Sequence, residues 1–60
     1  MNNYLFSNFF LGDDFIVRAF DLPQAERIAW DWFGTGVEFL RTISDTEMEK
    51  SPLEVFDMWS

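Results

Sequence analysis

The stretch DLPQAERIAWDWFG, residues 21–34, decides the fold because it carries the signals for both ends of a helix. Asp21 can cap the first turn, a proline follows within that turn, and Gln24 stands three residues after the cap, as in a capping box. Gly34 stands where a residue in the left-handed conformation commonly ends a helix. The sequence therefore predicts a helix over residues 21–33.

One side of this helix is apolar and needs a second layer to cover it. The residues that form the stripe recur at i, i+3, i+4 and i+7: Ala25, Ile28, Ala29 and Trp32. Trp30 lies off the stripe, so we expect it at the surface. The layer beneath the stripe must come from the rest of the chain.

The segments around the helix have the composition of β-strands. Residues 4–11 and 15–20 are joined by a glycine and two aspartates, a short link that is typical of a hairpin. Residues 37–43 predict a third strand, and residues 53–59 can add a fourth at a sheet edge. The order ββαβ or ββαββ predicts an α+β fold, a small antiparallel sheet of three to four strands with one helix packed on it.

The length of 60 residues predicts a single domain, residues 1–60. The chain has no cysteine and no histidine, so we expect neither disulfides nor structural zinc, and apolar packing must hold the fold. Eight Phe and three Trp supply large apolar side chains for that core. The aromatic residues that we expect at the surface, as contact anchors, are Tyr4, Trp30 and Trp59.

The hydrophobic pattern predicts no association with a membrane. No run approaches the roughly 20 apolar residues that span a bilayer. Residues 1–11 lack the basic leading segment of a signal peptide. We therefore expect a soluble protein, and the lack of cysteine favours a reducing compartment such as the cytoplasm.

The side chains that most enzymes use are missing. Without His and Cys, the usual general base, the thiolate nucleophile and most transition-metal ligands are absent. Hydrolysis by two carboxylates remains an alternative, and it requires a carboxyl group with a raised pKa in a cleft. The acidic clusters at residues 13–14 and 45–49 lack the ligand spacing of a calcium loop. We expect no enzyme, no cofactor and no metal site, with a small enzyme or calcium binder as the third hypothesis.

The charge pattern favours a basic protein as partner. Eleven acidic residues against four basic ones give a net charge of -7, which disfavours direct binding of nucleic acid and attracts basic surfaces. Residues 44–51 predict a loop or a short helical turn. In an extended segment Asp45, Glu47 and Glu49 would project to one side, about 6.6 Å apart; in a helix they would fan out.

Ten residues are therefore candidates for binding a partner. They are acidic residues and one tryptophan: Asp13, Asp14, Trp30, Asp31, Glu38, Asp45, Glu47, Glu49, Glu54 and Asp57. The alternative interpretation is that the acidic side chains only keep a small protein soluble.

The strand-to-helix pattern supplies a resemblance. Residues 15–19, FIVRA, followed by Asp21, Ala25 and Ala29, resemble the corresponding pattern of short phage proteins. Size, acidity and missing catalytic residues are similar to those of small acidic phage-encoded inhibitor proteins, which include anti-CRISPR proteins and uracil-DNA glycosylase inhibitors, several of them DNA mimics.

This resemblance implies a non-enzymatic inhibitor in the cytoplasm of a host cell. Its partner would be a basic, nucleic-acid-binding protein or complex of a bacterial host, with an anti-CRISPR role as the first specific hypothesis. The second hypothesis is a structural or assembly module that self-associates through a sheet edge and exposed aromatic residues. A homo-oligomer therefore stays open.

Overall fold

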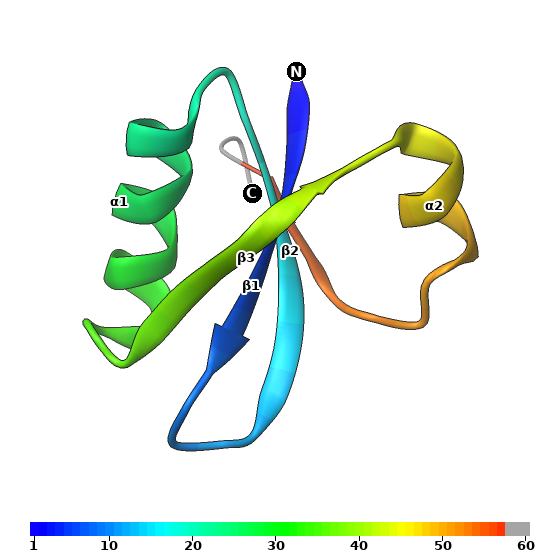
Figure 1. Ribbon diagram of the computed structural model, residues 1–60. Helices are drawn as coiled ribbons and strands as arrows, with labels where there is room; N and C mark the ends of the chain where they lie inside the picture. Colours follow the sequence, from blue (N-terminus) through cyan, green and yellow to red (C-terminus); the bar gives the residue numbers. More distant parts are fainter. Residues whose placement is uncertain (58–60) are drawn as a thin grey trace.

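A four-stranded sheet forms the centre of the molecule (Figure 1). The structure, a computed structural model, describes residues 1–57. Its elements are β1 (Asn2–Asn8), β2 (Asp13–Ala19), α1 (Leu22–Phe33), β3 (Val37–Ile43), α2 (Asp45–Lys50) and β4 (Val55–Asp57). The predicted α+β fold is confirmed, with one further short helix.

The hairpin of β1 and β2 turns earlier than predicted. The side-chain oxygen of Asn8 accepts hydrogen bonds from the backbone N–H groups of Phe10 (3.0 Å) and Leu11 (3.3 Å). Gly12 closes the turn with a φ of 71° and a hydrogen bond to the carbonyl of Asn8. Strand β1 therefore ends at Asn8 instead of Leu11, and the two aspartates of the predicted link belong to β2.

Helix α1 has the predicted ends. The carboxylate of Asp21 accepts a hydrogen bond from the N–H of Gln24 (2.9 Å), and Gly34, with a φ of 74°, donates to the carbonyl of Trp30 (2.7 Å). Ala25 and Ala29 are fully buried and bring the helix close to the sheet. The predicted stripe is wrong at one end, because Trp32 is 56% exposed.

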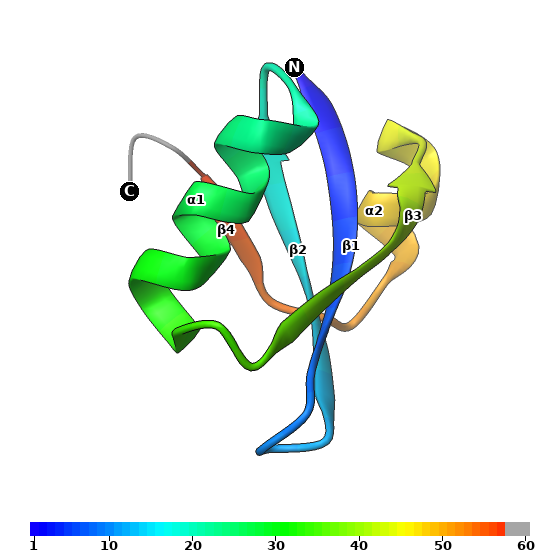
Figure 2. The ribbon, with the colours of Figure 1, turned by 60° about the vertical axis from the view of Figure 1, so that its left-hand side comes forward.

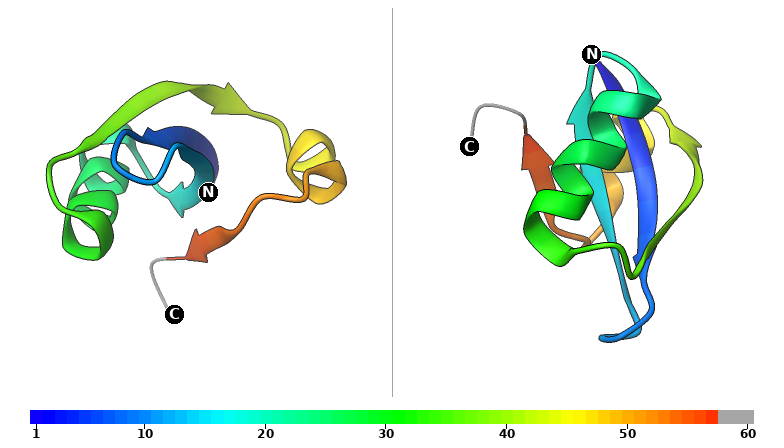
Figure 3. Two further views of the ribbon diagram at one scale, coloured as in Figure 1. Left: turned by 90° about the horizontal axis from the view of Figure 1, so that it is seen from below. Right: turned by 90° about the vertical axis from the view of Figure 1, so that its left-hand side faces the viewer.

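The sheet is mixed, with strand order β3-β1-β2-β4. β1 pairs antiparallel with β2 and β3, whereas β4 runs parallel to β2. After β3 the chain must cross from one edge of the sheet to the other. It does so through α2, on the side of the sheet opposite α1 (Figure 3), and so arrives at β2 in the parallel direction. Of the predicted strand 53–59, residues 58–59 lie outside the described residues.

The main core lies between α1 and the sheet. Phe6, Phe15 and Val17 fill it from the strands, and Phe6 and Phe15 stack with ring centroids 5.6 Å apart. The prediction that Tyr4 lies at the surface is wrong, because Tyr4 stands opposite Val17 on this face and is only 5% exposed. Ile16 points to the other face, the side on which the crossing through α2 runs, and it is fully buried there.

Candidate protein-binding surface

The β1–β2 hairpin projects beyond the rest of the molecule (Figures 1 and 2). Its turn carries three consecutive large apolar residues, Phe9, Phe10 and Leu11, which are 66%, 85% and 66% exposed. We call residues 9–11 the hairpin tip. The backbone N–H of Phe9 donates to the carbonyl of Gly36 (3.0 Å), which ties the tip to the start of β3. The tip is therefore an exposed apolar surface held on an ordered backbone.

A pocket lies beside the hairpin tip, and we call it the aromatic pocket. Leu11 contributes to its wall, and Phe15, Phe33 and Phe56 form the aromatic part of its lining. The centroid of the Phe33 ring lies 4.5 Å from that of the Phe15 ring and 5.2 Å from that of the Phe56 ring. The pocket is thus built where the start of β2, the end of α1 and β4 meet.

Three of the predicted binding residues line this pocket. Asp13 and Asp14 come from the start of β2, and Glu54 comes from the residue before β4. All three are exposed. Within residues 1–57, no hydrogen bond or ion pair engages their carboxylates, and none of the four basic residues lines the pocket. The fold therefore places unneutralised charge around an apolar cavity.

Glu38 belongs to the same end of the molecule. It pairs in register with Ser7 on β1, and Ser7 pairs with Asp14 on β2. Residues directly opposite each other share a face of the sheet, so Glu38 and Asp14 lie on one face, about 10 Å apart across two strand spacings.

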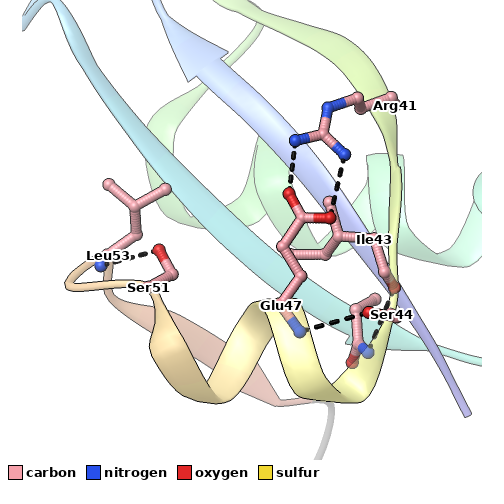
Figure 4. Close-up of polar contacts among 7 residues, drawn as sticks. Arg41, Ile43, Ser44, Glu47, Ser51 and Leu53 are labelled. Atoms are coloured by element: carbon pink, nitrogen blue, oxygen red, sulfur yellow. Dashed lines mark hydrogen bonds and ion pairs between the residues drawn. The ribbon is translucent and has the colours of Figure 1, made fainter.

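The acidic run of residues 45–49 does not have the extended arrangement, because it forms helix α2. Ser44 caps this helix by accepting a hydrogen bond from the N–H of Glu47 (3.1 Å) (Figure 4). The carboxylate of Asp45 accepts a hydrogen bond from the side chain of Asn3 (2.7 Å). Glu47 forms an ion pair with Arg41. Two of the three carboxylates are therefore engaged inside the chain, and Glu49 is exposed.

The ion pair of Arg41 and Glu47 changes the acidity of both groups. The hydrogen bond from Arg41 lowers the pKa of Glu47 and outweighs the opposite effect of desolvation. The same hydrogen bond raises the pKa of Arg41. Glu47 is consequently charged but paired at neutral pH.

The remaining candidates lie on other parts of the surface. Trp30 and Asp31 are exposed on α1. Asp57 is half-buried in β4, in register with Arg18 of β2. The structure therefore gathers Asp13, Asp14 and Glu54 at one pocket and separates them from these three residues.

Sequence reasoning missed the hairpin tip, because the apolar run of residues 4–11 predicts a strand that continues through residue 11. The signal was present in Asn8, whose side chain is a common acceptor for backbone N–H groups two and three residues later, followed by Gly12. It also missed the aromatic part of the pocket, which depends on contacts between distant segments.

Among residues 1–57, no group of three His, Cys, Asp or Glu side chains is arranged to hold a metal ion. No helix in the described part of the chain has both the length and the apolar character needed to cross a bilayer.

Comparison with known proteins adds no relative. No family model, curated protein or solved structure matches this chain.

Proposed function

We propose that this chain is a non-enzymatic inhibitor that binds a basic, nucleic-acid-binding surface of a bacterial host protein. The observation that carries the proposal is the position of the exposed hairpin tip beside a pocket rimmed by three unpaired carboxylates. An inhibitor of this kind occupies the groove of its target and so excludes nucleic acid.

The hairpin tip supplies apolar contact area for such a complex. Exposed apolar patches bordered by polar residues mark interaction sites on soluble proteins. Aromatic residues, Phe included, are enriched in the buried centre of protein interfaces. Phe9 and Phe10 present their rings on a backbone already fixed by Asn8, so little conformational entropy is lost when they are buried.

The carboxylates supply selectivity for a basic target. Complementary charge speeds association and suppresses unsuitable partners. A net charge of -7 adds a long-range field of the same sign. Asp13, Asp14 and Glu54 would then contact Lys or Arg side chains that otherwise hold phosphate groups.

A specific observation also supports self-association as the second candidate function. The outer edge of β3 has no neighbouring strand in the described sheet. Two features of β3 nevertheless oppose the pairing of a second copy at this edge. Leu40 is left without a partner by a register shift opposite Leu5 and Phe6, and Glu38 and Arg41 place charges along the strand. Bulges and charges are devices that protect sheet edges.

The test begins with capture from a bacterial lysate on the immobilised chain, at low and high salt, followed by mass spectrometry. The captured protein is then purified, and displacement of its nucleic acid by the chain is measured by fluorescence anisotropy. We expect release at high salt and competitive displacement. A captured protein that keeps its nucleic acid in the presence of saturating chain would contradict the proposal.

A matched pair of variants separates a specific surface from net charge. The pocket variant carries Asp13→Asn, Asp14→Asn and Glu54→Gln. The control carries the same number of neutralised carboxylates elsewhere: Glu26→Gln, Asp31→Asn and Glu49→Gln. Loss of displacement in the pocket variant alone supports the proposal, whereas equal loss in both variants points to net charge only.

Sedimentation velocity of the chain by itself tests the second candidate, because an assembly module would form a stable oligomer that is insensitive to salt. The narrower expectation of an anti-CRISPR role stays a prediction, and the identity of the captured protein tests it.

A further inference from the structure

The aromatic pocket exists because β4 is shorter than its neighbour. β4 pairs with β2 only from Ile16 to Arg18, so residues 13–15 of β2 have no strand on this side. The pocket occupies that gap with a cavity volume of about 320 Å³. This volume is near the lower end of the range for small-ligand pockets, roughly 300–1,000 Å³. A space of this size accepts one side chain of a partner.

The rings that line the pocket suit a cation. Phe15, Phe33 and Phe56 pack against one another at centroid distances of 4.5, 5.2 and 5.7 Å, and of the three Phe33 and Phe56 remain partly exposed. The face of an aromatic ring carries negative charge density and attracts a cation that lies within about 6 Å of the centroid. A flat cation that lies on the partly exposed ring of Phe33 or Phe56 would therefore be held by both apolar contact and electrostatics.

The rim of the pocket excludes an uncharged occupant. Covering Asp13, Asp14 or Glu54 with an apolar side chain would remove water from a carboxylate without giving it a hydrogen-bond partner, and that costs free energy. No other described residue bonds to these carboxylates. The occupant must bring positive charge and several donors.

We infer that the aromatic pocket binds one arginine side chain of the partner protein. This inference rests on the proposed function and names the chemistry by which the partner is recognised. A guanidinium group is planar, stacks on rings and donates two parallel hydrogen bonds to a carboxylate. A lysine ammonium is a compact, strongly hydrated point charge, so it gains less from rings and carboxylates together.

The experiment uses the full chain and three blocked tripeptides, acetyl-Gly-Arg-Gly-amide and its Lys and Leu counterparts. Each is titrated at low salt, and the NMR signals of the chain are followed. We expect the arginine peptide to shift the ring signals of Phe15, Phe33 and Phe56 saturably, with weaker shifts from the lysine peptide and none from the leucine peptide.

Variants locate the effect. Asp13→Asn with Glu54→Gln should weaken arginine binding by about two- to fivefold per carboxylate removed, the range of exposed ion pairs. The control Asp31→Asn with Glu49→Gln should bind as the parent chain does. Phe33→Leu keeps an apolar side chain but removes a ring, and it should reduce the preference for arginine over lysine.

The inference is overturned if the arginine peptide leaves the pocket signals unmoved, if the leucine or lysine peptide moves them equally, or if both variant pairs bind alike. Any of these results leaves the proposed function standing as long as the chain still displaces nucleic acid from a captured protein. Conversely, arginine binding at the pocket without such displacement supports the inference and removes the inhibitor proposal.

Discussion

The guanidinium of Arg41 donates hydrogen bonds to both carboxylate oxygens of Glu47 and so ties strand β3 to helix α2 (Figure 4). The two residues are six positions apart, and the Ser44 cap orients the first turn of the helix between them. A residue expected to contact a partner therefore has a partner inside the chain. This pair secures the start of the segment that crosses the sheet to β4.

The pair predicts a specific acid sensitivity. Arg41 lowers the pKa of Glu47 in the folded chain, so the folded state binds the proton less readily than the unfolded chain does. The stabilising contribution is present above the usual glutamate pKa of about 4.3 and is lost as pH falls through the lowered folded value. Arg41→Gln should therefore flatten the acid end of a plot of thermal midpoint against pH.

The control for this prediction is Arg27→Gln, which removes the same charge from an exposed position on α1. Its acid profile should follow that of the parent chain. If both variants show the same profile, the ion pair contributes nothing measurable, as is common for exposed pairs.

Removal of the N-cap of α1 should lower the stability of the folded chain. Asp21→Ala leaves the N–H of Gln24 without its acceptor and should reduce the free energy of unfolding by about 1 kcal/mol. Urea denaturation followed by circular dichroism measures it. Asp31→Ala, in the last turn of the same helix, removes an equal charge from the end where the helix dipole disfavours it and should leave stability unchanged or slightly higher. Equal losses would contradict a capping role.

Local signals explain why α1 was predictable. Its caps and its apolar repeat lie within fourteen residues, and Asp21, Gln24 and Gly34 act where the sequence places them. Helix α2 had a comparable signal, since Ser44 stands three residues before Glu47 as in a capping box. The six-residue length of α2 and the alternating acidic residues made a loop equally acceptable.

Non-local relationships explain what the sequence did not reveal. The parallel direction of β4 follows from a crossing between opposite edges of the sheet, which no local pattern encodes. The meeting of Asp14 and Glu54 at one pocket depends on that crossing. Burial of Tyr4 depends on its register with Val17. The sequence indicates that acidic and aromatic residues are candidates for binding a partner. Which of them lie close together depends on the fold.

Truncation of the hairpin tip should weaken target binding without lowering the stability of the chain. Phe10 is 85% exposed, so Phe10→Ala should leave the urea midpoint unchanged. The same variant should weaken the complex with the captured target by about thirtyfold or more, since a hot-spot truncation costs about 2 kcal/mol or more. Titration calorimetry measures the affinity. Phe20 is another exposed aromatic residue, directly after the far end of β2, and Phe20→Ala should leave the affinity intact. Equal losses in the two variants would remove the tip from the interface.

The lack of a side chain at Gly36 sets the position of the hairpin tip. The ring of Phe10 lies directly over Gly36, where any added Cβ would overlap ring carbons. Because the ring is the free end of an exposed side chain, Gly36→Ala should move the ring at little cost in stability and weaken target binding about as much as Phe10→Ala does. Ring-proton chemical shifts would report the displacement.

The double variant Gly36→Ala with Phe10→Ala decides whether the glycine acts through the ring. With the ring already absent, the added methyl group has nothing to displace, so the double variant should bind as weakly as Phe10→Ala alone and no more weakly. Such non-additivity is the signature of two residues in direct contact. If the two losses add, Gly36 affects binding by another route, such as the hydrogen bond from Phe9 to its carbonyl, and the close approach of Phe10 is incidental to recognition.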